Sequence, residues 1–135
     1  MAKAFIHARS SAAKFGGTPE EYEDIHIFLD GSKGAHPDNR HRAATHTAWF
    51  ISYVIPRVFG HTRVNSAGRT YSTVDVAEQH ILEDYSHKFI PTLSDFLGEM
   101  EMKDWMQNGR GDELPPSCRK LYKGKSGSVT YKLMD

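Results

Sequence analysis

Apolar residues recur every three or four positions along most of the chain before Met106, and this spacing places them on one face of an α-helix. The pattern therefore predicts amphipathic helices, each burying one stripe of side chains. They are expected over residues 2–15, 19–30, 36–60, 72–87 and 91–106. Weak alternation of apolar and polar residues predicts short β-hairpins over residues 62–73 and 120–133.

These elements predict a mainly α fold, a single-domain bundle of four or five helices with one or two short β-hairpins. The helical periodicity ends near Met106, and the stretch that follows contains two glycines and two prolines before the terminal hairpin. We therefore expect a helical domain over residues 1–107 and a C-terminal loop and hairpin arm over residues 108–135.

Capping sequences mark two of the helix starts. Thr18 precedes Pro19 and stands three residues before Glu21, so the threonine and the glutamate can each accept a hydrogen bond from the other's backbone N–H. Ser72 and Asp75 repeat this spacing with aspartate in the usual place of glutamate. These two caps predict where the second and fourth helices begin.

The helix expected over residues 36–60 is the longest, and it carries both apolar residues and histidines. Trp49 and Tyr53, one turn apart, are expected in the core. His41 and His46 are five residues apart, so at about 100° per residue they diverge around the helix axis. If both are functional, they face different partners, or a metal ion lies at the edge between their two faces.

The composition excludes several classes of protein. A single cysteine, Cys118, excludes an internal disulfide and a zinc site built from cysteines. No apolar run approaches the length that spans a bilayer, and no hydrophobic signal segment begins the sequence, so we expect a cytoplasmic protein. The formal net charge is zero, which does not favour general binding to nucleic acids or membrane surfaces.

Two segments with the same spacing, His26-x-x-x-Asp30 and His80-x-x-x-Asp84, lie on predicted helices. Residues four apart stand one above the other on a helix, so each pair can offer an imidazole nitrogen and a carboxylate oxygen to one divalent ion. Together with His41 or His46, these pairs would form a site suited to zinc, manganese, iron or nickel. Such an ion polarises a phosphoryl oxygen or lowers the pKa of water to about 7.

A purely structural interpretation explains the same spacing. A histidine four residues from an aspartate can simply share a side-chain hydrogen bond with it, and a buried histidine bonded to a carboxylate is a common device in protein cores. A carboxylate can also orient a histidine that binds metal through its other nitrogen. The spacing alone leaves a metal site, a structural network and metal-free catalysis open.

Three further residues are candidates for roles around such a site. Arg40 and Arg42 can bind a phosphate through the forked guanidinium group, or they can pair with nearby aspartates. Glu78 can act as a base beside a metal-bound water, although an exposed helical glutamate is the ordinary case.

Several short segments carry a resemblance to a known family. They are Phe15-Gly-Gly17, Tyr22-x-x-Ile-His26, Leu29-Asp-x-Ser-Lys33, Asp38-x-Arg-His-Arg-Ala43-x-x-His46, Glu78-Gln-His80-x-x-x-Asp84 and Ile90-Pro-Thr92. As a set they are similar to a family of small uncharacterised proteins from bacteria and phages, over about residues 5 to 98. Similar members carry a second histidine at the place of Thr47. The resemblance implies a bacterial or phage source and no particular activity.

The sequence thus favours a divalent-metal-binding protein that acts as a metal-dependent hydrolase of phosphate esters in nucleotides or nucleic acids. The alternative is a non-catalytic interaction protein, such as an inhibitor or a structural subunit, whose histidines only rigidify the core. A homo-oligomer formed through the C-terminal arm fits either hypothesis. Binding of single-stranded nucleic acid through the basic terminal hairpin, with Tyr122 and Tyr131, ranks below both.

Overall fold

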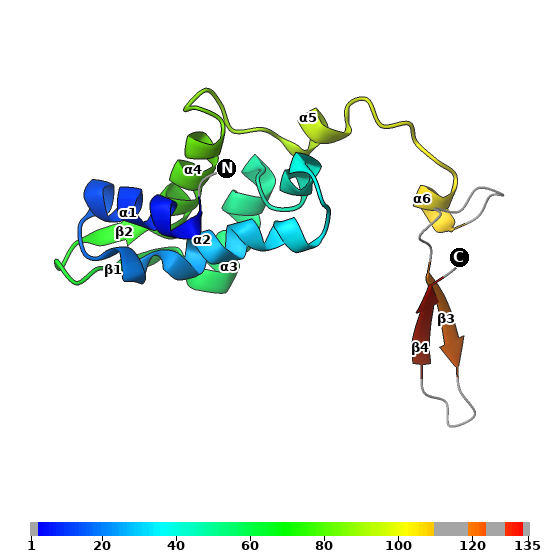
Figure 1. Ribbon diagram of the computed structural model, residues 1–135, viewed down its shortest axis with the longest axis horizontal. Coiled ribbons are helices and arrows are strands. Elements are labelled where there is room, and N and C mark those ends of the chain that lie inside the picture. The colour runs from blue at the N-terminus through cyan, green and yellow to red at the C-terminus, as the bar shows by residue number, and fades with distance from the viewer. Residues whose placement is uncertain (1–2, 110–118, 124–128, 134–135) are drawn as a thin grey trace. The chain divides into compact units, whose positions relative to one another are not determined.

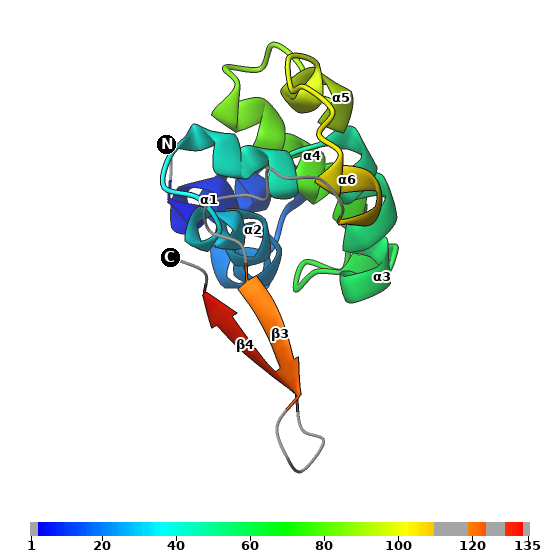
Figure 2. The same ribbon diagram turned by 90° about the vertical axis from the view of Figure 1, so that its right-hand side faces the viewer.

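Two helices near the start of the chain pack against each other and against a third that is distant in the sequence (Figure 1). α1 (Ala4–Phe15) contacts α2 (Glu23–Asp30), and both contact α4 (Thr73–Asp84). Figure 2 shows the same three helices from a second direction. The buried apolar side chains are those of Ala8, Tyr22, Ile25, Leu29, Ile51, Ile55, Tyr71, Val76, Ala77 and Ile81. The predicted mainly α fold with short β-hairpins is confirmed.

This computed structural model describes residues 3–109, 119–123 and 129–133. The chain folds as two compact units, Met1–Glu99 and Met100–Asp135. The division predicted after residue 107 stays a prediction. Among the described residues, no helix combines the length and the apolar character needed to cross a bilayer.

The predicted caps begin their helices as expected. Thr18 and Glu21 form a reciprocal capping box, which starts a short 3₁₀ turn, Pro19–Glu21, directly before α2. The Ser72 side chain accepts a hydrogen bond from the backbone N–H of Asp75 at the start of α4. Each cap satisfies backbone donors that have no partner inside the helix.

The continuous helix predicted over residues 36–60 is wrong. The chain forms a 3₁₀ segment, Asn39–Ala44, then a turn, then a π-helical stretch, Phe50–Val54, and finally α3 (Ile55–Phe59). The turn forms because tertiary hydrogen bonds replace helical ones: the Thr45 hydroxyl donates to the carbonyl of Leu29 over 2.7 Å, and the N–H of Ala48 donates to the carbonyl of Pro91 over 2.9 Å.

Two side chains expected in the core lie at the surface because of this break. Trp49 is 56% exposed and Tyr53 is 47% exposed, and their rings stack on each other with centroids 5.1 Å apart. The turn also gives His46, which lies within it, a direction that a continuous helix would not allow. His46 is fully buried.

The helix predicted over residues 91–106 is also shorter than expected. α5 (Leu93–Leu97) begins at a capping box formed by Thr92 and Asp95, and it stops before Gly98. Glycine is among the weakest helix formers, which accounts for the early end. The second unit contains a separate helix, α6 (Trp105–Asn108).

Both predicted hairpins are confirmed as antiparallel strand pairs. In the first unit, β1 (Thr62–Val64) pairs with β2 (Thr70–Ser72). In the second unit, β3 (Arg119–Lys123) pairs with β4 (Val129–Leu133). The predicted turn at 124–127 and most of the predicted loop at 108–117 lie outside the described residues.

Candidate metal centre

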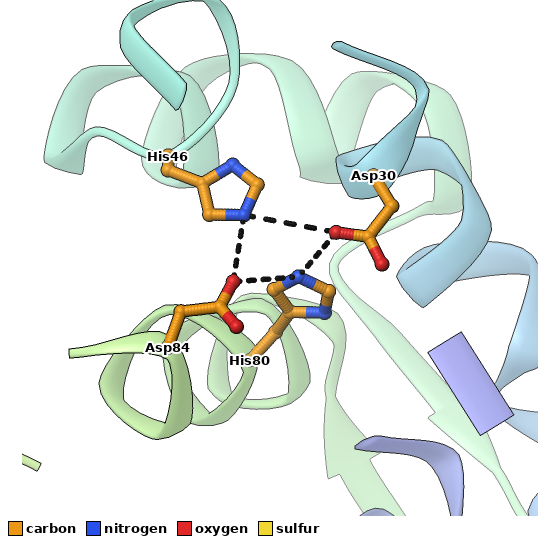
Figure 3. Close-up of side chains that lie close together, drawn as sticks. All are labelled: Asp30, His46, His80 and Asp84. Atoms are coloured by element: carbon orange, nitrogen blue, oxygen red, sulfur yellow. Dashed lines mark hydrogen bonds and ion pairs between the residues drawn. The ribbon is translucent and has the colours of Figure 1, made fainter. Parts of the chain in front are cut away.

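Four side chains from three separate segments point toward one another in the first unit (Figure 3). Asp30 is the last residue of α2, His46 lies in the turn after the 3₁₀ segment, and His80 and Asp84 lie on α4. One donor atom from each of the four residues lies within 4.8 Å of the donors of the other three. This group, Asp30, His46, His80 and Asp84, is called the His/Asp cluster below.

The contacts within the His/Asp cluster alternate between nitrogen and oxygen. Nε2 of His46 lies 3.0 Å from Oδ2 of Asp84 and 3.9 Å from Oδ1 of Asp30. Nε2 of His80 lies 3.1 Å from Oδ1 of Asp30 and 3.3 Å from Oδ2 of Asp84. Two imidazole nitrogens and two carboxylate oxygens therefore surround a common centre, and this donor set suits a divalent transition metal.

Regular helix geometry and the turn at Thr45 together position the four side chains. His80 and Asp84 are one turn apart on α4, so both face the end of α2, where Asp30 lies. His46 reaches the same place because Thr45, beside it, is tied to the carbonyl of Leu29 on α2. The break in the predicted long helix thus brings the fourth side chain to the cluster.

The cluster is almost closed to solvent. The side chains of His46 and His80 are fully buried, that of Asp84 is 1% exposed and that of Asp30 is 10% exposed. The second oxygen of each carboxylate is not the one that faces the two histidines. Oδ2 of Asp30 lies 3.6 Å from Nζ of Lys33, and Oδ1 of Asp84 lies 3.3 Å from Nε2 of His7.

Burial and hydrogen bonds shift the pKa values of the four groups in different directions. Burial opposes ionisation of Asp84, but its hydrogen bonds to His46 and His7 outweigh burial and hold its pKa far below the usual range. Burial also opposes ionisation of Asp30, and the hydrogen bond to His80 lowers its pKa overall. The same bonds raise the pKa of His80 against the effect of burial, whereas burial lowers the pKa of His46. The two carboxylates, with lowered pKa values, therefore face two imidazoles whose pKa values are shifted in opposite directions.

The sequence of this chain matches one family model over residues 2–106, described as a domain of unknown function (DUF6915). The chain belongs to the DUF6915 family. Neither the curated proteins nor the solved structures gave a match. All four members of the His/Asp cluster lie within the DUF6915 segment.

His26, predicted as a metal ligand, lies behind the cluster of this DUF6915 domain and not in it. Its Nδ1 is 2.9 Å from Nδ1 of His80, and its Nε2 is 2.7 Å from the hydroxyl of Ser11. Burial and the neighbouring His80 lower the pKa of His26 to about 3, so its ring is neutral. Both ring nitrogens are thus used in hydrogen bonds to protein groups, which is the arrangement of a residue that supports a ligand.

His41, the other alternative for a metal ligand, also lies outside the cluster. Its Nδ1 is hydrogen-bonded to Ser32 over 2.8 Å, and its ring centroid lies 6.2 Å from that of His46. The Thr45 hydroxyl joins these two parts, because it lies 3.0 Å from the hydroxyl of Ser32 and 2.8 Å from Nδ1 of His46. His41 therefore belongs to the polar surroundings of His46.

The two arginines predicted to bind an anion have different surroundings in the DUF6915 domain. Arg40 is exposed and forms a two-pronged ion pair with Asp38 over 2.7 to 3.1 Å. Arg42 is 8% exposed, and its Nη2 lies 3.9 Å from Oδ1 of Asp84. Nε of Arg42 is buried without a hydrogen-bond partner among the described residues. Of these two arginines, only Arg42 borders the His/Asp cluster.

Glu78 is not brought to the cluster. It is half-buried on α4 two residues before His80, and a helix turns by about 200° over two residues, so it leaves α4 on a different side. The base role predicted for Glu78 thus has no support from its position.

Sequence reasoning gave too little weight to His7. Its Nδ1 contacts Glu83 at 2.8 Å, its Nε2 lies 3.3 Å from Oδ1 of Asp84, and its ring stacks on that of His80 at 3.9 Å. The available signal was the spacing of His7 and Ser11, which are one turn apart on α1 and face α4 together. The His7 ring covers one face of the His80 ring, and the Ser11 hydroxyl contacts Gln79 and His26.

Proposed function

We propose that this protein binds one divalent transition-metal ion through Asp30, His46, His80 and Asp84 and uses it to hydrolyse a phosphate ester of a nucleotide or nucleic acid. The observation that carries the proposal is the convergence of four nitrogen and oxygen donors within 4.8 Å of one another. Burying two ionised carboxylates so close together is unfavourable unless their charge is balanced. A divalent cation would balance it. The metal is manganese, iron, nickel or zinc, the ions that such donors accept.

The number of ligands bears on whether the centre is catalytic. Four protein ligands complete the tetrahedral shell of zinc, which is the pattern of structural zinc sites. An ion that prefers five or six ligands, such as manganese or iron, would keep positions open for water and a phosphoryl oxygen. When bound, such an ion would polarise the phosphoryl group and lower the pKa of water to about 7.

Arg42 is the residue that we assign to the phosphate. Its guanidinium group lies at the edge of the cluster, is largely shielded from water and retains a donor without a partner among the described residues. A guanidinium fork matches the geometry of phosphate oxygens, and a buried one interacts with them more strongly than an exposed one. Arg40 is a weaker candidate because Asp38 already occupies its fork.

A cavity lined by Tyr85, whose ring Arg42 contacts, offers space for the organic part of a substrate. The guanidinium carbon lies 5.1 Å from the centroid of the Tyr85 ring, and Tyr85 follows Asp84 directly in the chain. The same ring lines a cavity of about 170 Å³ with Phe89, Pro91, Asp95 and Phe96. We assign the group attached to the phosphate to this mostly apolar cavity.

The metal centre is tested by loading and elemental analysis. Untagged apoprotein is dialysed separately against manganese, iron(II), nickel and zinc, and the metal retained after gel filtration is measured. We expect about one equivalent of at least one ion, and less than about a tenth in the His46→Ala and His80→Ala variants. His61→Ala is the control, because His61 is exposed. Less than a tenth of an equivalent of every ion in the unmodified protein rejects the proposal.

Hydrolysis is tested on the same loaded samples with p-nitrophenyl phosphate and bis(p-nitrophenyl) phosphate. Metal-dependent release of p-nitrophenol that is lost in His80→Ala supports a hydrolase. One bound equivalent without turnover of either ester or of a nucleotide mixture retains the metal centre and rejects the catalytic part.

The burial of all four cluster side chains favours one second candidate, a non-catalytic interaction protein in which the cluster stabilises the fold. A partner would then bind elsewhere, for example at the exposed and stacked rings of Trp49 and Tyr53. The two candidates differ in the elemental analysis and in turnover. A bacterial or phage source, a cytoplasmic location and self-association through the C-terminal arm remain proposals.

A further inference from the structure

We propose that Gln79, Ser11 and His26 form a hydrogen-bond chain with one fixed direction, and that this chain keeps a proton on Nδ1 of His80, so that Nε2 is the nitrogen whose lone pair can bind a metal ion in the cluster. The three residues are positioning residues, since they act through His80. The inference rests on the proposed function, because the value of that lone pair is to bind the metal. The hydrogen-bond direction itself is argued only from contacts in the protein.

The direction of the chain is set at Gln79, on α4. Its Nε2 lies 3.1 Å from the carbonyl oxygen of His7 and 2.9 Å from Oε1 of Glu83. A carbonyl and a carboxylate that already accepts from a histidine can only accept, so the NH₂ end of the amide must face them. The carbonyl end of Gln79 therefore faces Ser11.

Ser11 passes the constraint on to His26. Its hydroxyl oxygen lies 2.5 Å from Oε1 of Gln79, and a contact that short between two oxygens requires a proton between them. Ser11 has the only proton available, so it donates to Gln79. The carbonyl of His7, 3.1 Å from the same hydroxyl, already accepts from Gln79. At its contact with Nε2 of His26, at 2.7 Å, Ser11 must then accept. The proton of the neutral His26 ring therefore lies on Nε2.

The chain ends at His80. Because His26 uses its proton toward Ser11, its Nδ1 carries a lone pair, and Nδ1 of His80 at 2.9 Å must donate to it. Nε2 of His80, the atom that faces Asp30 and Asp84, is therefore the ring nitrogen left for a metal ion. A proton on Nε2 can bond to the two carboxylates in the metal-free protein, and a bound ion would take the place of that proton.

Reversing the chain would break it. If Ser11 donated to His26, the Ser11 and Gln79 oxygens would face each other at 2.5 Å without a proton. If the Gln79 amide were turned over to repair this, its oxygen would face the carbonyl of His7 and the carboxylate of Glu83. Either change leaves buried acceptors unpaired, and each such group costs about 1 to 3 kcal/mol. The stated direction leaves none of these contacts unpaired.

His46 shows the same arrangement through a shorter connection. Its Nδ1 lies 2.8 Å from the hydroxyl of Thr45, and that hydroxyl lies 2.7 Å from the carbonyl oxygen of Leu29. If Thr45 donates to Leu29, it accepts from Nδ1 of His46, and Nε2 of His46 is the nitrogen left for a metal ion in the cluster. Support of metal-binding histidines through the other ring nitrogen is the general pattern.

The direction is tested first by ¹⁵N NMR of histidine-labelled protein, without any metal. Coupling across the N–H···N bond shows whether the proton between the two Nδ1 atoms is bonded to His80 or to His26. We expect this proton on His80, and we expect the single ring proton of His26 on Nε2. A proton on Nδ1 of His26 overturns the proposal.

The consequence for binding is tested with Ser11→Ala and Gln79→Met. Without the Ser11 hydroxyl, His26 can move its proton to Nδ1 and His80 must then place one on Nε2. We expect metal affinity, measured by competition with a chromogenic chelator, to fall about 10- to 100-fold while the fold is retained by circular dichroism. Ser10→Ala, the neighbouring position on α1, is the matched control and should bind normally. An unchanged affinity in both Ser11→Ala and Gln79→Met overturns the positioning role.

Failure of the two proposals can be told apart. If the NMR places the proton on His80 but no ion binds to the unmodified protein, the direction of the chain is supported and the metal centre is rejected. If an ion binds but the proton lies on Nδ1 of His26, the metal centre is supported and the inference about the chain is overturned.

Discussion

His26 and Asp30, one turn apart on α2, contact opposite nitrogen atoms of the same ring, the imidazole of His80. Nδ1 of His26 is 2.9 Å from Nδ1 of His80, and Oδ1 of Asp30 is 3.1 Å from Nε2 of His80. A single helix thus fixes both the position and the orientation of a side chain 50 residues away from Asp30. The His-x-x-x-Asp spacing on α2 combines one supporting residue with one cluster member, whereas on α4 both residues belong to the cluster.

This relationship predicts that charge at Asp30 matters more than its shape. Asp30→Asn keeps the size of the side chain but removes one of the two carboxylates, so the charge that favours a divalent cation is halved. Metal affinity should fall by more than the roughly 10- to 100-fold typical of a lost outer-shell partner. Competition with a chelator measures the effect.

Asp24→Asn is the control for this prediction, because Asp24 is on the same helix, is exposed and pairs with Arg63 at the surface. Equal affinities in Asp30→Asn and the unmodified protein would show that Asp30 is not a ligand.

Metal removal should destabilise the fold. An ion that binds the folded chain and not the unfolded chain stabilises it by about 2.7 kcal/mol at a free concentration of 100 Kd. The melting temperature should therefore rise with added metal and fall with chelator. His46→Ala should abolish this metal-dependent shift, and the control His61→Ala should keep it. A melting curve that is the same with metal and with chelator would contradict a centre made by three separate segments.

The pH dependence of the metal-free protein follows from His26. Its pKa is about 3 in the folded state, against 6.5 ordinarily, so below pH 6.5 the unfolded chain takes up a proton that the folded chain does not. Stability should therefore fall as the pH is lowered, by about 2 kcal/mol between pH 6.5 and pH 5 from this group. His46, whose pKa is also lowered, adds an effect of the same sign.

The other cluster groups act outside that window. The raised pKa of His80 gives stability that is present below about pH 6.5 and is lost as the pH rises through its folded value. The lowered pKa values of Asp30 and Asp84 give stability that is lost only below about pH 4. Urea unfolding of the apoprotein at pH 6.5 and pH 5 tests the prediction. The loss of unfolding free energy between pH 6.5 and pH 5 should be smaller in His26→Gln. An equal loss in that variant would contradict the prediction.

Local patterns predicted the helices and part of the cluster. Apolar periodicity located α1, α2 and α4, because each of these helices buries one stripe, and side-chain caps marked the 3₁₀ turn before α2 and the start of α4. Residues four apart on α2 and α4 then gave Asp30, His80 and Asp84, since regular helix geometry makes such pairs neighbours. The sequence could not distinguish the role of His26 from that of Asp30, because the difference depends on which edge of the His80 ring each side chain meets.

The position of His46 could not be predicted from local patterns. It depends on the turn after residue 44, which forms because Thr45 bonds to Leu29 and Ala48 bonds to Pro91. These partners are distant in the sequence, so no helix propensity near His46 reveals them. The exposure of Trp49 has the same cause, since the helix that carries it starts again after the turn with a different face toward the core.

The assignment of the phosphate to Arg42 predicts a difference between two neighbouring arginines. Arg42→Gln removes a buried guanidinium group beside the cluster, so it should lower kcat/KM for the active p-nitrophenyl ester by about 100-fold, the usual effect of a lost donor to a developing anion. Arg40→Gln should change kcat/KM by less than about twofold, because the charge of Arg40 is exposed and has a small effect. Metal content should stay at about one equivalent in both variants, because neither arginine can bind a cation.

Inhibition by inorganic phosphate separates an effect on phosphate binding from an effect on folding. The inhibition should weaken in Arg42→Gln and persist in Arg40→Gln. Equal loss of activity in both variants, or loss in Arg40→Gln alone, would show that the phosphate does not bind beside Asp84.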